Sequence, residues 1–200
     1  MKTARKALML ILCAALLVSA TVMGTLAYLT SNDSVTNTFS VGQVKITLTE
    51  APVDAEGQAT DGDRVKANAY KLYPGKEYDK DPTVFVDANS EDCWLFVKVE
   101  NGIAQIEANG EGNDTIAEQI AANGWTLVSG ETNVYARATT NVARDSVKVF
   151  ESFAIAESVT NDTLANYGTA MVNVTAYAVQ ADGFDTAADA WAAAKTELSA

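Results

Sequence analysis

The sequence predicts an all-β protein, a two-sheet antiparallel sandwich with short helical inserts and a C-terminal helix. Roughly seven or eight short segments alternate apolar and polar residues, the pattern of strands that bury one face. Polar stretches that contain glycine, asparagine or aspartate separate these segments. Helical patterns are short and lie between the strands or at the C-terminal end. The 200 residues suffice for one such domain with a substantial core and an export signal.

The first 27 residues have the features of a signal peptide, and we expect an N-terminal strand region at 28–49 and the remainder of a single β-sandwich domain at 50–200. Basic residues precede the apolar run 7–22, namely Lys2, Arg5 and Lys6. Thr25 and Ala27 are small residues at positions −3 and −1 of a cleavage site, so cleavage is predicted between Ala27 and Tyr28. We therefore expect a secreted protein, in the extracellular matrix or at the cell surface of a Gram-positive type of bacterium.

Two other interpretations of this segment are open. Residues 7–29 are nearly long enough to span a bilayer, which would make them an uncleaved membrane anchor. A lipoprotein is disfavoured, because Cys13 follows Leu12, where a lipobox needs a small residue, and lies midway through the apolar run. After cleavage at Ala27 we expect no contact with the membrane.

The charge of the processed chain limits its partners. Cleavage removes three basic and no acidic residues, so 11 Lys and Arg remain against 26 Asp and Glu, a net charge of −15. Such a surface repels nucleic acid and anionic membrane. It also keeps subunits apart at low salt.

Cys93 is the one cysteine that remains after processing, so no intramolecular disulfide can form. We expect it to be a buried apolar residue rather than a reactive thiol. Durability outside the cell must then come from the core or from assembly.

The region 28–49 reads as a strand whose apolar side switches across Gly42. Val35, Asn37, Phe39 and Val41 would point to one side of a strand, and all but Asn37 are apolar, whereas the apolar residues Val44, Ile46 and Leu48 would point to the other side. One extra residue restores a single buried face, and glycine tolerates it, so we predict a β-bulge at Gly42. Two short strands joined by a turn at 41–43 would fit the same residues.

This region also carries a family resemblance. The runs GTLAYLTSND and NTFSVGQVKITLTE resemble the start of bacterial TasA and camelysin type proteins, secreted chains released by a dedicated signal peptidase and associated with biofilm matrix fibres. The likeness extends more loosely to YPGKEYDKDPTVFV, SEDCWLFVKVE and AYAVQADGFDTAADAWAA. It implies a jelly roll with helices in its connections and a signal peptidase as a partner during export.

The resemblance further implies that an N-terminal strand of one subunit completes the sheet of the next. In this chain that strand would run from Tyr28 to about Phe39, with Leu29, Val35 and Phe39 as candidate anchors.

The segment 51–68 is polar and acidic, and we read it as a solvated loop. Its carboxylates could bind calcium, and they are Asp54, Glu56, Asp61 and Asp63. They lack the spacing and the terminal glutamate of an EF-hand, so a solvated charge cluster is favoured.

The clearest strand runs over 93–100. It follows a turn at 73–75, a short strand at 83–88 and a second turn at 89–92. The face predicted to be core consists of Cys93, Leu95, Val97 and Val99. Trp94 and Phe96 on the opposite face need a cover, from the same chain or from a neighbouring subunit.

The second half of the chain alternates helices and strands. Thr115 and Glu118 form a capping box for a helix over 113–124. The other expected elements are a hairpin of 125–128 and 133–137, a strand at 147–155 with Val147, Val149, Phe153 and Ile155 inward, a helical turn at 161–167, a strand at 169–180 and a helix at 185–198.

The chain contains no histidine, which excludes the HExxH zinc site and triads or dyads that use histidine. Camelysin is named for a proteolytic activity, and no zinc site can be carried over to this sequence. Paired carboxylates have no specificity among 26 acidic residues. We therefore expect no enzymatic activity, no cofactor and no metal.

Two classes of function fit these features. The first is a structural subunit of extracellular biofilm matrix fibres, a homopolymer that forms by β-strand donation from the mature N-terminus. The second is a monomeric surface binding or adhesion module that uses exposed aromatic residues such as Trp94, Tyr135 or Tyr167. An accessory protein that anchors or caps another fibre is a variant of the first.

Overall fold

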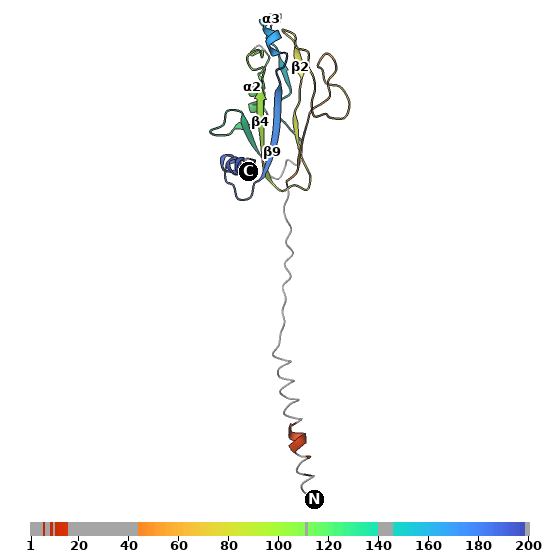
Figure 1. Cartoon of the computed structure of the whole chain (residues 1–200), viewed down its shortest axis with the longest axis vertical. Coiled ribbons are helices and arrows are strands. Elements are labelled where there is room, and N and C mark those ends of the chain that lie inside the picture. The colour runs from red at the N-terminus through yellow and green to blue at the C-terminus, as the bar shows by residue number, and fades with distance from the viewer. Residues whose placement is uncertain are drawn as a thin grey trace. The chain divides into compact units, whose positions relative to one another are not determined.

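A computed structural model describes residues 6, 9, 11–15, 44–110, 112–139 and 146–198. It divides the chain into two compact units, 1–40 and 41–200. In the first unit residues 11–15 are helical. Within the described part of the chain, no helix has the length and apolar character needed to cross a bilayer. The second unit holds every strand described below (Figure 1).

The second unit is mostly β-structure, as predicted, and its described strands form three antiparallel sheets. The first sheet has the order β1 (Ile46–Thr49), β3 (Thr83–Val86) and β7 (Ser146–Lys148). The second pairs β2 (Glu77–Asp79) with β8 (Ser152–Ala154). The third has the order β5 (Thr126–Leu127), β6 (Val134–Thr139), β4 (Cys93–Asn101) and β9 (Val172–Gln180), with β4 and β9 side by side in Figure 1.

The helices lie close to the predicted positions. They are α2 (Ile116–Ala122), α3 (Asn161–Leu164), the 3-10 helix η1 (Ala165–Tyr167) and α4 (Ala187–Leu198). The predicted capping box is confirmed, because the Thr115 hydroxyl accepts from the Glu118 N–H and the Glu118 carboxylate accepts from the Thr115 N–H. Gly124, at φ 80°, follows the end of α2.

Replacing Glu118 with glutamine is expected to destabilise α2 at neutral pH and to have little effect in acid. Hydrogen bonds from the Thr115 hydroxyl and N–H lower the pKa of the Glu118 carboxyl. A lowered pKa in the folded state means that the contribution is complete above the ordinary glutamate pKa and is lost as the pH falls through the folded value. Thermal unfolding at pH 7 and pH 2 tests this, since the wild type and the Glu118→Gln variant should differ at pH 7 and converge at pH 2. An equal difference at both values would contradict it.

The predicted strand over 147–155 is divided in the structure. Its expected inward residues Val147, Val149, Phe153 and Ile155 are all buried. The β-ladder nevertheless ends at Lys148 and another begins at Ser152, because β7 pairs with β3 whereas β8 pairs with β2. The chain thus changes partner strand at this point, and Phe150 is also buried there. The strand β2, which the sequence did not indicate, is stabilised by the fully buried Tyr78 and by its pairing with β8.

One core draws side chains from all three sheets. It includes the four residues predicted for the inner face of β4, and the Cys93 thiol is buried there as expected. A second, smaller cluster lies on the other face of β4, where Phe96 packs against Trp191 of α4 with ring centroids 5.1 Å apart. Trp94 packs against this cluster as well, so α4 of the same chain covers the two aromatic residues.

Candidate functional site

An open groove follows β9 on the side away from β4. Among the described strands β9 pairs only with β4, and β1 pairs only with β3, so each has an edge that no other strand covers. On β1 this edge is partly occupied, because the Lys66 ammonium donates to the Leu48 carbonyl and Glu50, directly after β1, forms an antiparallel bridge with Val65. A cavity of about 740 Å³ lies along the first half of β9, and a second of about 690 Å³ lies along its second half. Ala176 lines both cavities. Together they extend along the whole free edge of β9.

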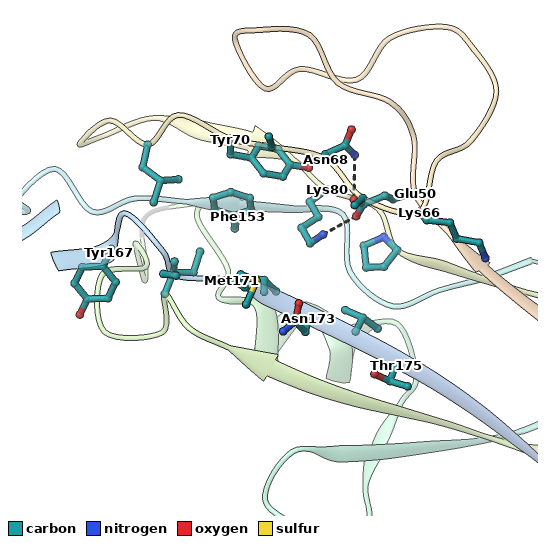
Figure 2. Close-up of a pocket in the computed structure, with 18 of the residues that line it drawn as sticks. Glu50, Lys66, Asn68, Tyr70, Lys80, Phe153, Tyr167, Met171, Asn173 and Thr175 are labelled. Carbon is teal, nitrogen blue, oxygen red and sulfur yellow. Dashed lines mark hydrogen bonds and ion pairs between the residues drawn. The ribbon is translucent and has the colours of Figure 1, made fainter. Parts of the chain in front are cut away.

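The groove differs in width along its length. Cα atoms of β1 and β9 approach within 8 Å of each other. A strand that pairs with both edges would need them roughly 10 Å apart. Beyond Glu50 the chain leaves β1, and residues 66–72 form the wall that faces the first half of β9 (Figure 2). The first cavity is therefore the part of the groove with room for another segment of chain.

The core is incompletely covered along this groove. The inner-face residues of β4 are at most 6% exposed, whereas those of the two free strands are only half-buried. On β9 these half-buried residues are Val172, Val174, Ala176 and Ala178, and on β1 they are Ile46 and Leu48. Met171, at the start of the groove, is 64% exposed. An inner sheet face that remains open to water has room for a further apolar segment.

Polar groups occupy one part of this otherwise apolar cavity. The Lys80 Nζ lies 2.6 Å from the Glu50 Oε2, and these side chains are 11% and 6% exposed. The Asn68 amide donates to the other carboxylate oxygen of Glu50 at 3.1 Å. Figure 2 shows this pair between the segment of Asn68 and Tyr70 and the strand that carries Asn173. Burial, with the Glu50 charge as the next cause, raises the pKa of Tyr70 well above its ordinary value, so its hydroxyl stays protonated and donates to the Asp79 carbonyl.

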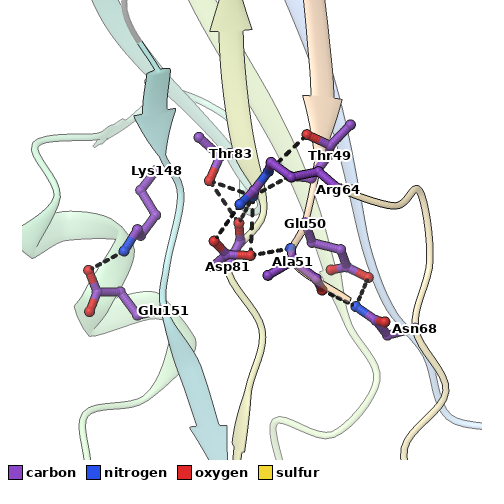
Figure 3. A network of polar contacts seen from close by, with 9 residues as sticks. All are labelled: Thr49, Glu50, Ala51, Arg64, Asn68, Asp81, Thr83, Lys148 and Glu151. Atoms are coloured by element: carbon purple, nitrogen blue, oxygen red, sulfur yellow. Dashed lines mark hydrogen bonds and ion pairs between the residues drawn. The ribbon is translucent and has the colours of Figure 1, made fainter. Parts of the chain in front are cut away.

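A second polar network fixes β1 beside the groove (Figure 3). Arg64 forms an ion pair with Asp81 at 2.9 Å and donates to the Thr49 carbonyl and the Thr83 hydroxyl. It thereby joins the end of β1 to the start of β3. The position of the β1 edge depends on this arginine as well as on the β1–β3 ladder.

The charge of the first cavity is opposite in sign to that of the chain. Its ionisable lining residues of definite charge are Lys66, Lys71, Lys80 and Glu50. Three cations and one anion give this cavity a positive balance on a protein whose net charge is −12. A neutral or weakly acidic segment is therefore the occupant that the groove fits best electrostatically.

The predicted site residues have different outcomes. Thr25, Ala27 and Tyr28, the residues of the predicted cleavage site, lie outside the described residues. So do the candidate anchors Leu29, Val35 and Phe39 and the predicted bulge at Gly42.

The aromatic residues considered for a binding platform lie on separate elements. Trp94 is half-buried next to α4 and donates to the Phe184 carbonyl at 3.4 Å. Tyr135 packs against the main core, and Tyr167 lines the groove. All three side chains pack against other parts of the chain and do not form one shared aromatic surface.

In the acidic loop at 51–68, one of the four carboxylates stabilises the conformation of the loop itself. The Asp54 carboxylate accepts from the N–H groups of Glu56 and Gln58, which closes a turn. No group of three or more potential metal ligands occurs among the described residues.

Glu50, Asn68 and Lys80 were not identified from the sequence. They come from the end of β1, from a loop and from the residue after β2, and 30 positions separate Glu50 from Lys80. No spacing rule joins such positions, because only the fold brings them together. Comparisons of the chain with protein-family models, with curated proteins and with solved structures found no match.

Proposed function

We propose that this protein is a secreted structural subunit of extracellular biofilm matrix fibres, and that it polymerises when the mature N-terminal arm, residues 28–43, adds a strand to the groove of the next subunit. The observation that carries the proposal is the open groove, in which two free strand edges and half-buried core residues lie together. A free edge offers unpaired N–H and C=O groups, which an added strand satisfies.

The composition of the arm suits this groove. Val35 and Phe39 share one parity with Leu29, so a strand would direct these apolar side chains to one face. Asp33 is the one charged side chain of the arm, and the amino group that cleavage frees at Tyr28 offsets it, so the arm is neutral overall and is not repelled by the positive balance of the first cavity. The small Ala176 on β9 leaves space opposite a large side chain such as Phe39.

Processing would control when assembly occurs. Cleavage after Ala27 frees the amino end of the arm, so strand donation is confined to the outside of the cell. The dedicated signal peptidase is then a required partner during export, and the later partner is a second copy of the chain.

At the level of fold, we propose that the three sheets act as two layers of a jelly-roll-like sandwich. The chain passes from β7 to β8 within three residues, which supports one layer made of the first and second sheets. The four-stranded sheet is the other layer. A core that takes side chains from all three sheets supports this arrangement.

Deleting residues 28–36 is expected to leave a folded monomer that forms no fibres. The deletion removes most of the arm but no residue of the described sheets. Circular dichroism checks the fold, size exclusion at raised salt checks the mass, and electron microscopy checks for fibres. Fibres of normal appearance from this variant would refute strand donation by the arm.

The two faces of the arm supply a matched comparison. Alanine at Leu29, Val35 and Phe39 should prevent assembly, because these side chains would enter the groove. Alanine at Thr30, Thr36 and Thr38 should allow it, because that parity would face water. Equal behaviour of the two triple variants would argue against a strand, and a sharp wild-type monomer peak under all conditions would favour a monomeric binding module.

A further inference from the structure

The Glu50–Lys80 ion pair is an unusual feature of the groove. Its side chains are 11% and 6% exposed, against 30% and 23% for the Arg64–Asp81 pair, and both line the first cavity. Burying two charges is costly, and apolar side chains of similar volume would often stabilise a fold equally well. The best-attested role of a buried polar group is to favour one alignment of two segments over other alignments, as a buried asparagine does for the register of two helices in a coiled coil.

The pair retains capacity for a ligand. The Lys80 ammonium has three N–H donors, and one of them is used by Glu50. The Glu50 carboxylate accepts from Lys80 and Asn68 and has further lone pairs. A side chain with both a donor and an acceptor could therefore bind both partners at once. A primary amide has these two functions in one group.

The arm contains such an amide at the matching parity. Val35, Asn37 and Phe39 would point to the same side of a strand, and Asn37 is the polar residue between two apolar anchors. Directed into an apolar groove, this amide would lose its hydrogen bonds to water unless it met a polar partner. Glu50 and Lys80 are buried charged groups in the wide part of that groove.

We infer that the Glu50–Lys80 pair binds the side-chain amide of Asn37 from the arm of a second copy and so fixes the register of strand donation. The inference rests on the proposed function. A slip of two residues keeps the apolar face inward, so the apolar anchors alone would tolerate it. The same slip would put Val35 or Phe39 against the ion pair and leave the Asn37 amide against apolar residues such as Leu48 or Phe153. The polar contact thus distinguishes registers that hydrophobicity alone does not.

The test compares critical concentrations for assembly of the processed protein. Asn37→Leu should raise the critical concentration about tenfold or more, which corresponds to about 1.4 kcal/mol per tenfold change. The double variant Glu50→Leu with Lys80→Met should raise it similarly. Combining all three substitutions should restore it to within about threefold of wild type, because an apolar residue then meets an apolar wall.

Thr38→Leu is the matched control, since it adds the same side chain at the parity that would face water, and it should leave the critical concentration unchanged. Because Asn37 lies outside the described sheets, its variant tests the inference even if the double groove variant fails to fold by circular dichroism. Two results would overturn the register contact without affecting the proposal of strand donation. One is a critical concentration for Asn37→Leu equal to that of the wild type, and the other is a triple variant whose fold-increase equals the product of the increases for Asn37→Leu and for the double groove variant. Absence of fibres from the wild type would overturn both.

Discussion

Replacing Ala176 with tryptophan is expected to abolish assembly and to leave the monomer folded. Ala176 lies on the inner face of β9, lines both cavities of the groove and is only half-buried. The cavities of about 740 and 690 Å³ give an indole space without displacing the closed part of the core. The side chain would then occupy the volume that a donated strand needs. Overpacking destabilises a core mainly where no such space exists.

The other edge of the same sheet provides the control for this experiment. Thr126 lies on β5, is exposed and pairs with Ala136 on β6. Thr126→Trp introduces the same side chain at a free edge that is not part of the groove. Electron microscopy should find fibres from this variant and none from Ala176→Trp, with both folded by circular dichroism. Fibres from the Ala176→Trp variant would mean that strand donation does not use this groove.

Replacing Gly57 with alanine is expected to lower the free energy of unfolding by about 2–5 kcal/mol. Gly57 has φ +78°, a left-handed conformation that favours glycine. A Cβ at this position would lie 2.5 Å from Cδ1 of Tyr78 and 3.3 Å from Cδ1 of Tyr70. Tyr78 cannot give way easily, since it is 1% exposed and stacks on Phe153 with ring centroids 5.0 Å apart.

A second glycine separates the backbone effect from the clash. Gly130 has a similar φ of +84°, but a Cβ there would meet nothing within 4 Å. Gly130→Ala should therefore cost only the conformational part, about 1–2 kcal/mol. Urea unfolding of both variants at equal protein concentration gives the comparison. If the two variants lost equal free energy of unfolding, the clash between the new Cβ at position 57 and Tyr78 would contribute nothing to the destabilisation.

These expectations depend on features that the sequence indicated to different degrees. The strand at 93–100 was evident because apolar residues alternate without interruption from Cys93 to Val99, and that face is buried throughout. Helix α2 was evident because Thr115 and Glu118 form a capping box ahead of an i, i+4 apolar pair. In both cases the signal is local, so a single sequence contains it.

Other elements had no local signal. Strand β2 has three residues, and it exists because Tyr78 is buried and β8 lies beside it. The interruption between β7 and β8 follows from a change of partner strand, to which the periodicity of one segment is insensitive. The sequence indicated that Trp94 and Phe96 need a cover, but it did not decide between a segment of the same chain, which α4 proves to be, and a neighbouring subunit.

By itself, the sequence determined the β-rich class, the strand and helix faces that bury apolar residues, the excess of negative charge and the absence of histidine chemistry, because each depends on residue type or on spacing along the chain. Only the tertiary structure decided that β1 and β9 are left as free edges beside one groove and that Glu50, Asn68 and Lys80 meet in it. The physical reason is that edges and cavities arise from contacts between distant segments. Such contacts are fixed by the packing of whole sheets, which local periodicity does not specify.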